Sequence, residues 1–248
     1  MLTAIIVLVG AGDNINAQEK VFPFIPGEKL TFALRWTFIP AGEAVLEVLP
    51  VETINGINAR HFLLTVRSNS FVDQFYMVRD RVDAYTDIEM SHSVLYKQKQ
   101  LEGTTRRDIV VKFDWEKKEA NYTNFKEELD SIQILPGTFD PLSAFYYTRL
   151  FDLNAGLVIE RPVTDGKKNV IGKATIVKRE TIKLKIGTFD TYLMEPEVEH
   201  VGGVFEKSKG AKIQLWVTAD QRQIPVKIKS EVIVGSFVGE LISATGLK

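Results

Sequence analysis

The chain has 248 residues, of which 45% are hydrophobic and 25% charged, so it is large enough to bury a core without a disulfide or a structural metal. Its 31 basic and 32 acidic side chains leave a net charge of -1, which gives no electrostatic reason to expect nucleic acid as a partner. Cysteine is absent, and this excludes disulfides, thiolate catalysis, Cys-based zinc sites and the acylated cysteine of a bacterial lipoprotein.

The first residues carry a candidate leader. An apolar run over residues 4–9 has the length of a signal-peptide core and is too short to span a bilayer, so no transmembrane span is expected. Ala17 offers a cleavage site, but no basic residue precedes Lys20. We therefore predict a signal peptide over residues 1–17, with a start that could be truncated, and export of the mature chain to the periplasm or cell envelope.

A dinucleotide-binding turn competes for the same residues. Residues 7–12 resemble the first strand and glycine turn of such a fold, which needs a helix directly afterwards. Ile15 stands at the third glycine position, and Pro23 and Pro26 arrive too early for a helix. No cofactor is therefore expected.

The mature chain begins with alternating hydrophobic residues. Leu30, Phe32, Leu34, Trp36 and Phe38 share one face of a strand, because side chains alternate between the two faces. Residues 40–42 (Pro-Ala-Gly) predict the next turn, and Asn55-Gly56 predicts a hairpin. The same pattern predicts further strands over residues 43–49, 60–68, 75–86, 93–101, 107–115, 120–125, 158–163, 169–184, 192–200, 212–218, 225–234 and 236–243.

One segment has helical periodicity instead. Asp140 is a good N-cap and Pro141 fits the first helical position. Apolar residues then recur at helical spacing up to Leu150, which predicts a helix over residues 141–150. A helix this short is marginal in water, so it must pack its aromatic side on the sheet.

No linker or charge block divides these elements, so we expect one mainly β domain over residues 18–248. The preferred architecture is a strongly curved antiparallel sheet, or open β-barrel, with the short helix against the concave face. Two packed sheets are the alternative.

Several motifs follow one another along the mature chain: residues 26–30 (PGEKL), 35–36, 40–42, 139–147 (FDPLSAFYY), 187–190 (GTFD), 195–196, 202–203, 215–218 (LWVT), 220 and 224–226. In these motifs the chain resembles the bacterial family known as domain of unknown function 3108. The resemblance implies an exported protein and no established chemistry. The hairpin over residues 216–227 is also similar, at the level of fold, to LolA/LolB-type periplasmic lipoprotein carriers, which hold acyl chains between a curved sheet and helices.

The aromatic residues are the main candidates for a binding site. They could line an apolar pocket between sheet and helix that suits a lipid or another hydrophobic small molecule, or they could form plain core, which is favoured. The candidates are Trp36, Phe38, Phe75, Phe145, Tyr146 and Trp216.

Catalytic and metal motifs are weak by comparison. Glu195, Glu197 and Glu199 share a strand face and could bind a hard cation, but a solvated face paired with lysines is favoured. His61, His92 and His200 have no metal-site spacing, so no metal site is predicted.

The sequence therefore favours an exported envelope protein without internal catalytic machinery that binds an apolar ligand. One alternative is an envelope scaffold that binds another protein through a sheet edge or the loop at Gly202-Gly203. A second alternative is a carboxylate-dependent enzyme acting on glycans or lipids.

Overall fold

The computed structural model describes residues 21–197, 212–231 and 236–248, so the predicted leader lies outside the described residues. The elements are β1 (Lys29–Trp36), β2 (Ile39–Ile54), β3 (Ile57–Ser68), the short 3-10 helix η1 (Val72–Gln74), β4 (Arg79–Asp87), β5 (Ser93–Glu102), β6 (Thr105–Asp114), β7 (Glu119–Asn124), β8 (Glu127–Glu128), β9 (Ile132–Gln133), α1 (Pro141–Thr148), β10 (Val158–Thr164), β11 (Asn169–Leu184), β12 (Gly187–Pro196), β13 (Lys212–Thr218), β14 (Pro225–Glu231) and β15 (Ser236–Thr245).

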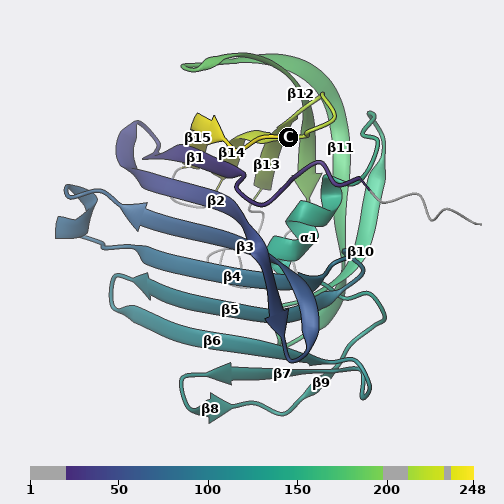
Figure 1. The fold of residues 1–248 in the computed structure, drawn as a ribbon. Coiled ribbons are helices and arrows are strands. Elements are labelled where there is room, and N and C mark those ends of the chain that lie inside the picture. Colours follow the sequence, from purple (N-terminus) through teal and green to yellow (C-terminus); the bar gives the residue numbers. More distant parts are fainter. Residues whose placement is uncertain (1–20, 198–211, 232–235) are drawn as a thin grey trace, which may run out of the picture.

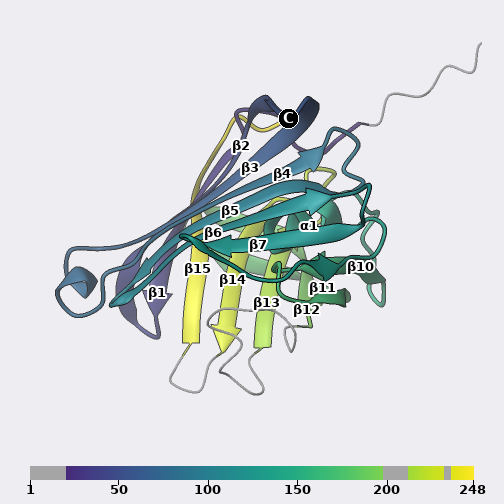
Figure 2. The same cartoon turned by 90° about the horizontal axis from the view of Figure 1, so that it is seen from below.

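Across the described residues, the strands form one 15-stranded sheet that does not close into a barrel. Neighbouring strands follow chain order from β10 to β15 and again from β1 to β8, and the two runs join where β1 pairs with β15. We call β1–β8 the N-terminal wing and β10–β15 the C-terminal wing. Figure 1 shows the two wings curving around α1, and Figure 2 shows the same arrangement from below. The prediction of a curved antiparallel sheet with one enclosed helix is confirmed.

The connector between β9 and α1 covers the free edges of both wings. Ile134 N donates to Lys118 O (2.9 Å) on one side, and Phe139 N donates to Pro162 O (2.9 Å) on the other. Ser93 N also donates to Thr138 O (3.0 Å), at the start of β5. The connector thus satisfies backbone groups that an open sheet edge would leave unpaired.

The predicted turn at residues 40–42 is wrong. The chain turns at Thr37 and Phe38, where Thr37 adopts a φ of 55°, and β2 runs through Pro40 and Gly42. Pro40 pairs with Arg35 beside a bulge, and Gly42 lies so close to β3 that a Cβ there would be 2.0 Å from Arg67 O. The glycine is required by the close approach of two strands, not by a turn.

α1 begins where its sequence predicts and ends two residues earlier than the expected Leu150. The Asp140 carboxylate is fully buried and accepts hydrogen bonds from Leu142 N (3.0 Å), Ser143 N (2.9 Å), Ser143 Oγ (2.6 Å) and Ser93 Oγ (2.6 Å). Burial raises the pKa of Asp140, and these hydrogen bonds oppose the rise. Asp140 therefore caps the helix and also fixes its start to β5.

The core between α1 and the N-terminal wing is aromatic. Tyr146 stacks on Phe62 with ring centroids 4.0 Å apart, and Phe24 meets both rings edge-on. All three side chains are completely buried. This packing supplies the tertiary stabilisation that so short a helix needs.

A buried ion pair lies beside this aromatic core. Arg149, which follows α1, donates from its two terminal nitrogens to the two carboxylate oxygens of Glu28 at 2.6 and 2.9 Å. It also donates to Arg222 O at 2.8 Å. Both side chains of the pair are 1% exposed. Three segments remote in sequence therefore meet at one bidentate contact, which we call the interior seam.

Candidate functional site

The six aromatic residues proposed as a pocket do not come together. Tyr146 and Trp216 are buried and Phe145 is half-buried, whereas Trp36, Phe38 and Phe75 are exposed. Trp216 Nε1 donates to Glu180 Oε1 (2.9 Å), so this side chain is already hydrogen-bonded within the C-terminal wing. The set divides into core residues and residues at one exposed end of the sheet.

An apolar pocket of about 420 Å³ lies elsewhere, where β15 ends near the β11–β12 and β13–β14 turns. We call it the C-terminal pocket. Its lining residues are Ile186, Thr188, Phe189, Asp190, Thr218, Ala219, Asp220, Arg222, Ile224, Val226, Leu241, Ala244 and Leu247. Leu241, Ile224 and Val226 also belong to a buried hydrophobic cluster of the C-terminal wing. The volume falls within the range of small-molecule sites.

The charged residues at this pocket are paired with one another or with neighbours. Asp220 accepts from Arg222 Nε (3.0 Å) and from Thr218 Oγ1 (2.7 Å). Burial raises the pKa of Asp220, but these hydrogen bonds outweigh burial and lower it. Asp190 accepts from Arg179 Nε (3.0 Å). Because these charges are neutralised, the pocket offers an apolar surface with a polar rim rather than a charged recognition site.

A second pocket, of about 340 Å³, lies on the N-terminal wing, and the buried His61 is one of its lining residues. His61 Nδ1 lies 2.7 Å from Glu52 Oε1, and its Nε2 lies 2.9 Å from Asp83 Oδ1. Ionised carboxylates only accept hydrogen bonds, so both contacts are made when both ring nitrogens carry protons. The ring also stacks on Tyr85, with centroids 4.3 Å apart.

Arg81 completes this histidine cluster. It donates to both carboxylate oxygens of Asp83, at 2.7 and 2.6 Å. Burial raises the pKa of Asp83, but hydrogen bonds from His61 and Arg81 outweigh burial and lower it to about 2. His61 therefore contacts both carboxylates, and Arg81 binds Asp83 alone, whose lowered pKa does not suit the general acid of a glycosidase-type mechanism.

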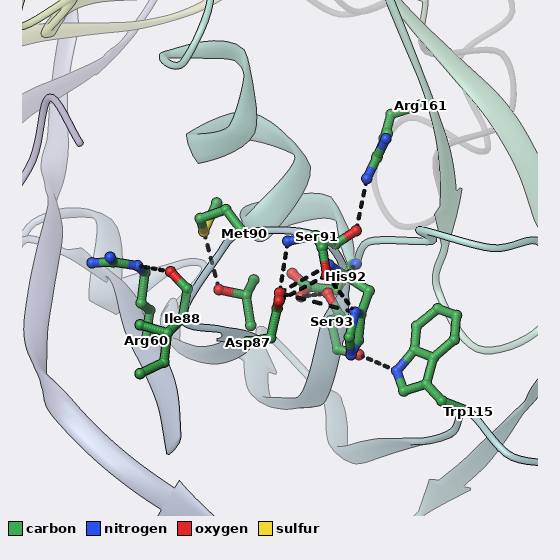
Figure 3. A network of polar contacts seen from close by, with 11 residues as sticks. Arg60, Asp87, Ile88, Met90, Ser91, His92, Ser93, Trp115 and Arg161 are labelled. Atoms are coloured by element: carbon green, nitrogen blue, oxygen red, sulfur yellow. Dashed lines mark hydrogen bonds and ion pairs between the residues drawn. The ribbon is translucent and has the colours of Figure 1, made fainter. Parts of the chain in front are cut away.

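A third polar network occupies the β4–β5 turn (Figure 3). Asp87 accepts from Ser91 N (2.6 Å), His92 N (3.0 Å) and Ser91 Oγ (2.7 Å), and Ser91 Oγ lies 2.7 Å from His92 Nδ1. In a catalytic triad the histidine lies between the serine and the carboxylate, whereas here the serine lies between the other two. Burial lowers the pKa of His92.

The same turn connects the two wings. Arg161, on β10, donates to Ser91 O (2.7 Å), and Trp115 Nε1 donates to Ser93 O (2.9 Å), as Figure 3 shows. Trp115 also covers His92, with ring centroids 4.5 Å apart. This network is therefore best explained as a structural contact between the turn, β6 and β10.

The candidate metal ligands are only partly described. Glu195 Oε1 accepts from Gln214 Nε2 (2.8 Å), Glu197 is exposed, and Glu199 and His200 lie outside the described residues, as does the Gly202-Gly203 loop. Within residues 21–197, 212–231 and 236–248, no three histidine, aspartate or glutamate side chains are placed to hold a metal ion.

Sequence reasoning missed the interior seam, the histidine cluster and the C-terminal pocket. His61 and Asp83 lie on adjacent predicted strands, but their contact depends on register, which a single sequence does not provide. The pocket combines the β11–β12 turn, the β13–β14 turn and the last residues of the chain, so it has no local signature.

A model of the family described as "Protein of unknown function (DUF3108)" matches residues 31–242. A β-barrel-like protein of the domain of unknown function DUF1849 from Brucella abortus shares the fold, with a TM-score of 0.56 at 10% identity, over 90% of this chain and 98% of that one. No curated protein matches the sequence.

Two further solved structures align with lower TM-scores. A "putative exported protein" with YmcC-like fold from Bacteroides fragilis covers 90% of this chain and 98% of its own, at 10% identity and a TM-score of 0.29. A "putative lipoprotein" from Parabacteroides distasonis covers 92% and 100%, at 13% identity and a TM-score of 0.32. In the part of the chain that the structure describes, no helix is long and apolar enough to cross a membrane.

Proposed function

This chain belongs to the DUF3108 family of proteins of unknown function, and we propose that it is a non-catalytic binding protein of the cell envelope that holds an apolar ligand in the C-terminal pocket. The pocket itself carries this proposal. It has the volume of a ligand site and an apolar base, and its acidic side chains are already paired with arginines. An acyl chain or another apolar molecule without a net charge matches such a lining.

Two further observations support a binding function. The histidine cluster and the β4–β5 turn both contain residue types used in catalysis, but their carboxylates are engaged in internal hydrogen bonds. The apolar run over residues 4–9 and the resemblance to exported proteins favour the envelope as the location.

The test uses purified protein and, as the probe, a dansyl-labelled fatty-acid methyl ester, which carries no carboxylate. Ala244 is half-buried and lines the pocket, so Ala244→Trp will fill it, whereas Ser243→Trp places the same ring on the opposite face of β15. We expect a saturable increase in dansyl fluorescence with the unchanged protein and with Ser243→Trp, and its loss with Ala244→Trp. Equal binding by both variants, or no saturable binding by the unchanged protein, would overturn the proposal.

A further inference from the structure

Large apolar side chains gather, exposed, at the end of the sheet opposite the C-terminal pocket. β1 runs from the pocket end, where Lys29 pairs with Thr245, to this other end, where Trp36 pairs with Phe237. We call this second region the aromatic end. Its exposed members are Trp36, Phe38, Ile39, Phe71, Phe75, Tyr76, Met77 and Phe237.

Direct contacts hold the segments of the aromatic end together. Asn69, at the start of the β3–β4 connection, donates from Nδ2 to Pro40 O (2.6 Å) and from its backbone N to Ala41 O (2.9 Å). Gly103 N, in the β5–β6 turn, donates to Met77 O (2.9 Å). Figure 1 shows the β1–β2 hairpin and the β3–β4 connection projecting on the same side of the molecule.

The β3–β4 connection is held in a defined conformation while its rings remain exposed. Asp73 accepts from Ser68 Oγ and from Arg79 Nη1 (3.0 Å), and Ser68 Oγ accepts from Val78 N (2.7 Å). Asn69 Oδ1 accepts from Val72 N (2.9 Å). Yet Phe75 is 77% exposed, and Phe38 on the adjacent hairpin is 91% exposed. Exposed apolar side chains gathered at one end of the sheet and held there by an ordered connection mark an interaction site.

Charge is arranged in two zones around these rings. Residues 36–41 contain no charged side chain, and in residues 69–78 the one charge, Asp73, is paired with Arg79. Behind the apolar zone, Arg67 and Arg106 are exposed, and Arg106 forms no ion pair with the described part of the chain. Glu43, on β2, is also exposed in this second zone.

The shape and chemistry of this end fit a bilayer surface. Phe38 projects from the β1–β2 turn and Phe75 from the β3–β4 connection, so these two rings form protruding tips. The tryptophan and the tyrosine at the same end favour the membrane–water interface. Arg67 stands opposite Glu43 on β2, whereas Arg106 stands opposite the uncharged Leu101, so Arg106 is the arginine set back from the tips that matches a phosphate of a lipid headgroup. We propose that the aromatic end docks the protein on the surface of a phospholipid bilayer, inserting Phe38 and Phe75 into the interfacial region. This docking is independent of the proposed ligand pocket.

Flotation with vesicles of phosphatidylethanolamine and phosphatidylglycerol tests the docking. We expect the unchanged protein to float with the vesicles and the double variant Phe38→Ser/Phe75→Ser to bind about tenfold or more weakly, because two apolar side chains no longer leave water. The matched control is Val51→Ser/Ile57→Ser. These two exposed apolar residues lie near the opposite end of β2, and we expect this variant to bind like the unchanged protein.

Fluorescence of Trp36 provides a second readout. Trp36 is 40% exposed, whereas Trp216 is buried and Trp115 packs on His92 at the β4–β5 turn, away from the aromatic end. Vesicle binding should therefore shift the emission to shorter wavelength, and Trp36→Phe should abolish the shift without abolishing flotation. Failure of the unchanged protein to float, or equal loss in the control variant, would overturn the proposal. Lipid-independent dimerisation that Phe38→Ser/Phe75→Ser abolishes would also overturn it and assign the surface to a second copy of the chain.

Discussion

The interior around α1 and the aromatic end use the same residue types in opposite ways. Around α1, Phe24, Phe62 and Tyr146 are completely buried beside a buried ion pair. At the aromatic end, Phe38 and Phe75 are largely exposed, and the polar side chains below them hold the loop. Aromatic content alone therefore does not identify a pocket. What decides is whether the ring packs in the interior between the sheet and α1 or stands at an exposed end of the sheet. Substitutions should consequently have very different effects in the two regions.

Arg149→Met should have the largest effect. It leaves the Glu28 carboxylate buried without its partner, and we expect the free energy of unfolding to fall by about 3–5 kcal/mol in urea denaturation. The double variant Glu28→Gln/Arg149→Met leaves no buried charge and should recover part of the loss. If Arg149→Met unfolds with the same free energy as the unchanged protein, the ion pair of the interior seam does not stabilise the fold.

Asp140→Ala should be the next most harmful. It removes the N-cap of α1 and leaves Ser93 Oγ and two helix N–H groups without their acceptor, so we expect a loss of about 2–3 kcal/mol. Asp140→Asn retains an acceptor oxygen and should lose less. If both variants unfold at the urea concentration of the unchanged protein, the cap does not fix the helix.

Acid should weaken the histidine cluster through Asp83. The pKa of Asp83 is about 2 in the folded chain and about 3.9 when unfolded, so its contribution is present above about pH 4 and is lost as pH falls towards 2. We expect this loss to amount to about 2 kcal/mol. Asp83→Asn lacks this carboxyl group. The difference in free energy of unfolding between the unchanged protein and Asp83→Asn, measured by urea denaturation, should therefore shrink as the pH falls from about 4 to about 2. A constant difference would contradict the assignment.

Tyr146→Phe should slightly stabilise the interior. The Tyr146 hydroxyl is buried and has no hydrogen-bond partner among the described residues. Removing it should raise the free energy of unfolding by about 0.5–1 kcal/mol, because an unsatisfied buried polar group is lost while the ring packing stays. A destabilisation in thermal or urea unfolding would reveal a partner for the hydroxyl.

The smallest effect on stability is expected at the aromatic end. Phe38→Ser and Phe75→Ser should each change the free energy of unfolding by no more than about 0.5 kcal/mol, since neither ring packs in the core. Urea denaturation without lipid measures this directly. A loss comparable with that of Asp140→Ala would mean that these rings support the fold and would weaken the distinction between the two regions.

Local patterns predicted much of the architecture. β11 has the predicted bounds because its alternation is long and Asn169 and Leu184 both adjoin turns, and α1 starts at Pro141 because the cap is encoded locally. The turn prediction at residues 40–42 failed because these residues lie within β2. Pro40 is paired beside a bulge, and Gly42 allows β2 and β3 to approach closely. The candidate pocket could not be predicted, since period-two patterns give the face of a strand but not what covers that face.

The pairing of β1 with β15 has a consequence for topology. Along the described path from β10 to β8, every other ladder joins strands that succeed one another in the chain, while the short β9 pairs back to β7. Lys248 Nζ donates to Phe22 O (3.1 Å), so the two ends of the described fold are adjacent. A circular permutant that joins these ends and opens the chain at residues 129–131 would place the strands of the path from β10 to β8 in chain order, with the short β9 ahead of them. Its contact order would fall, and it should fold faster than the natural connectivity allows.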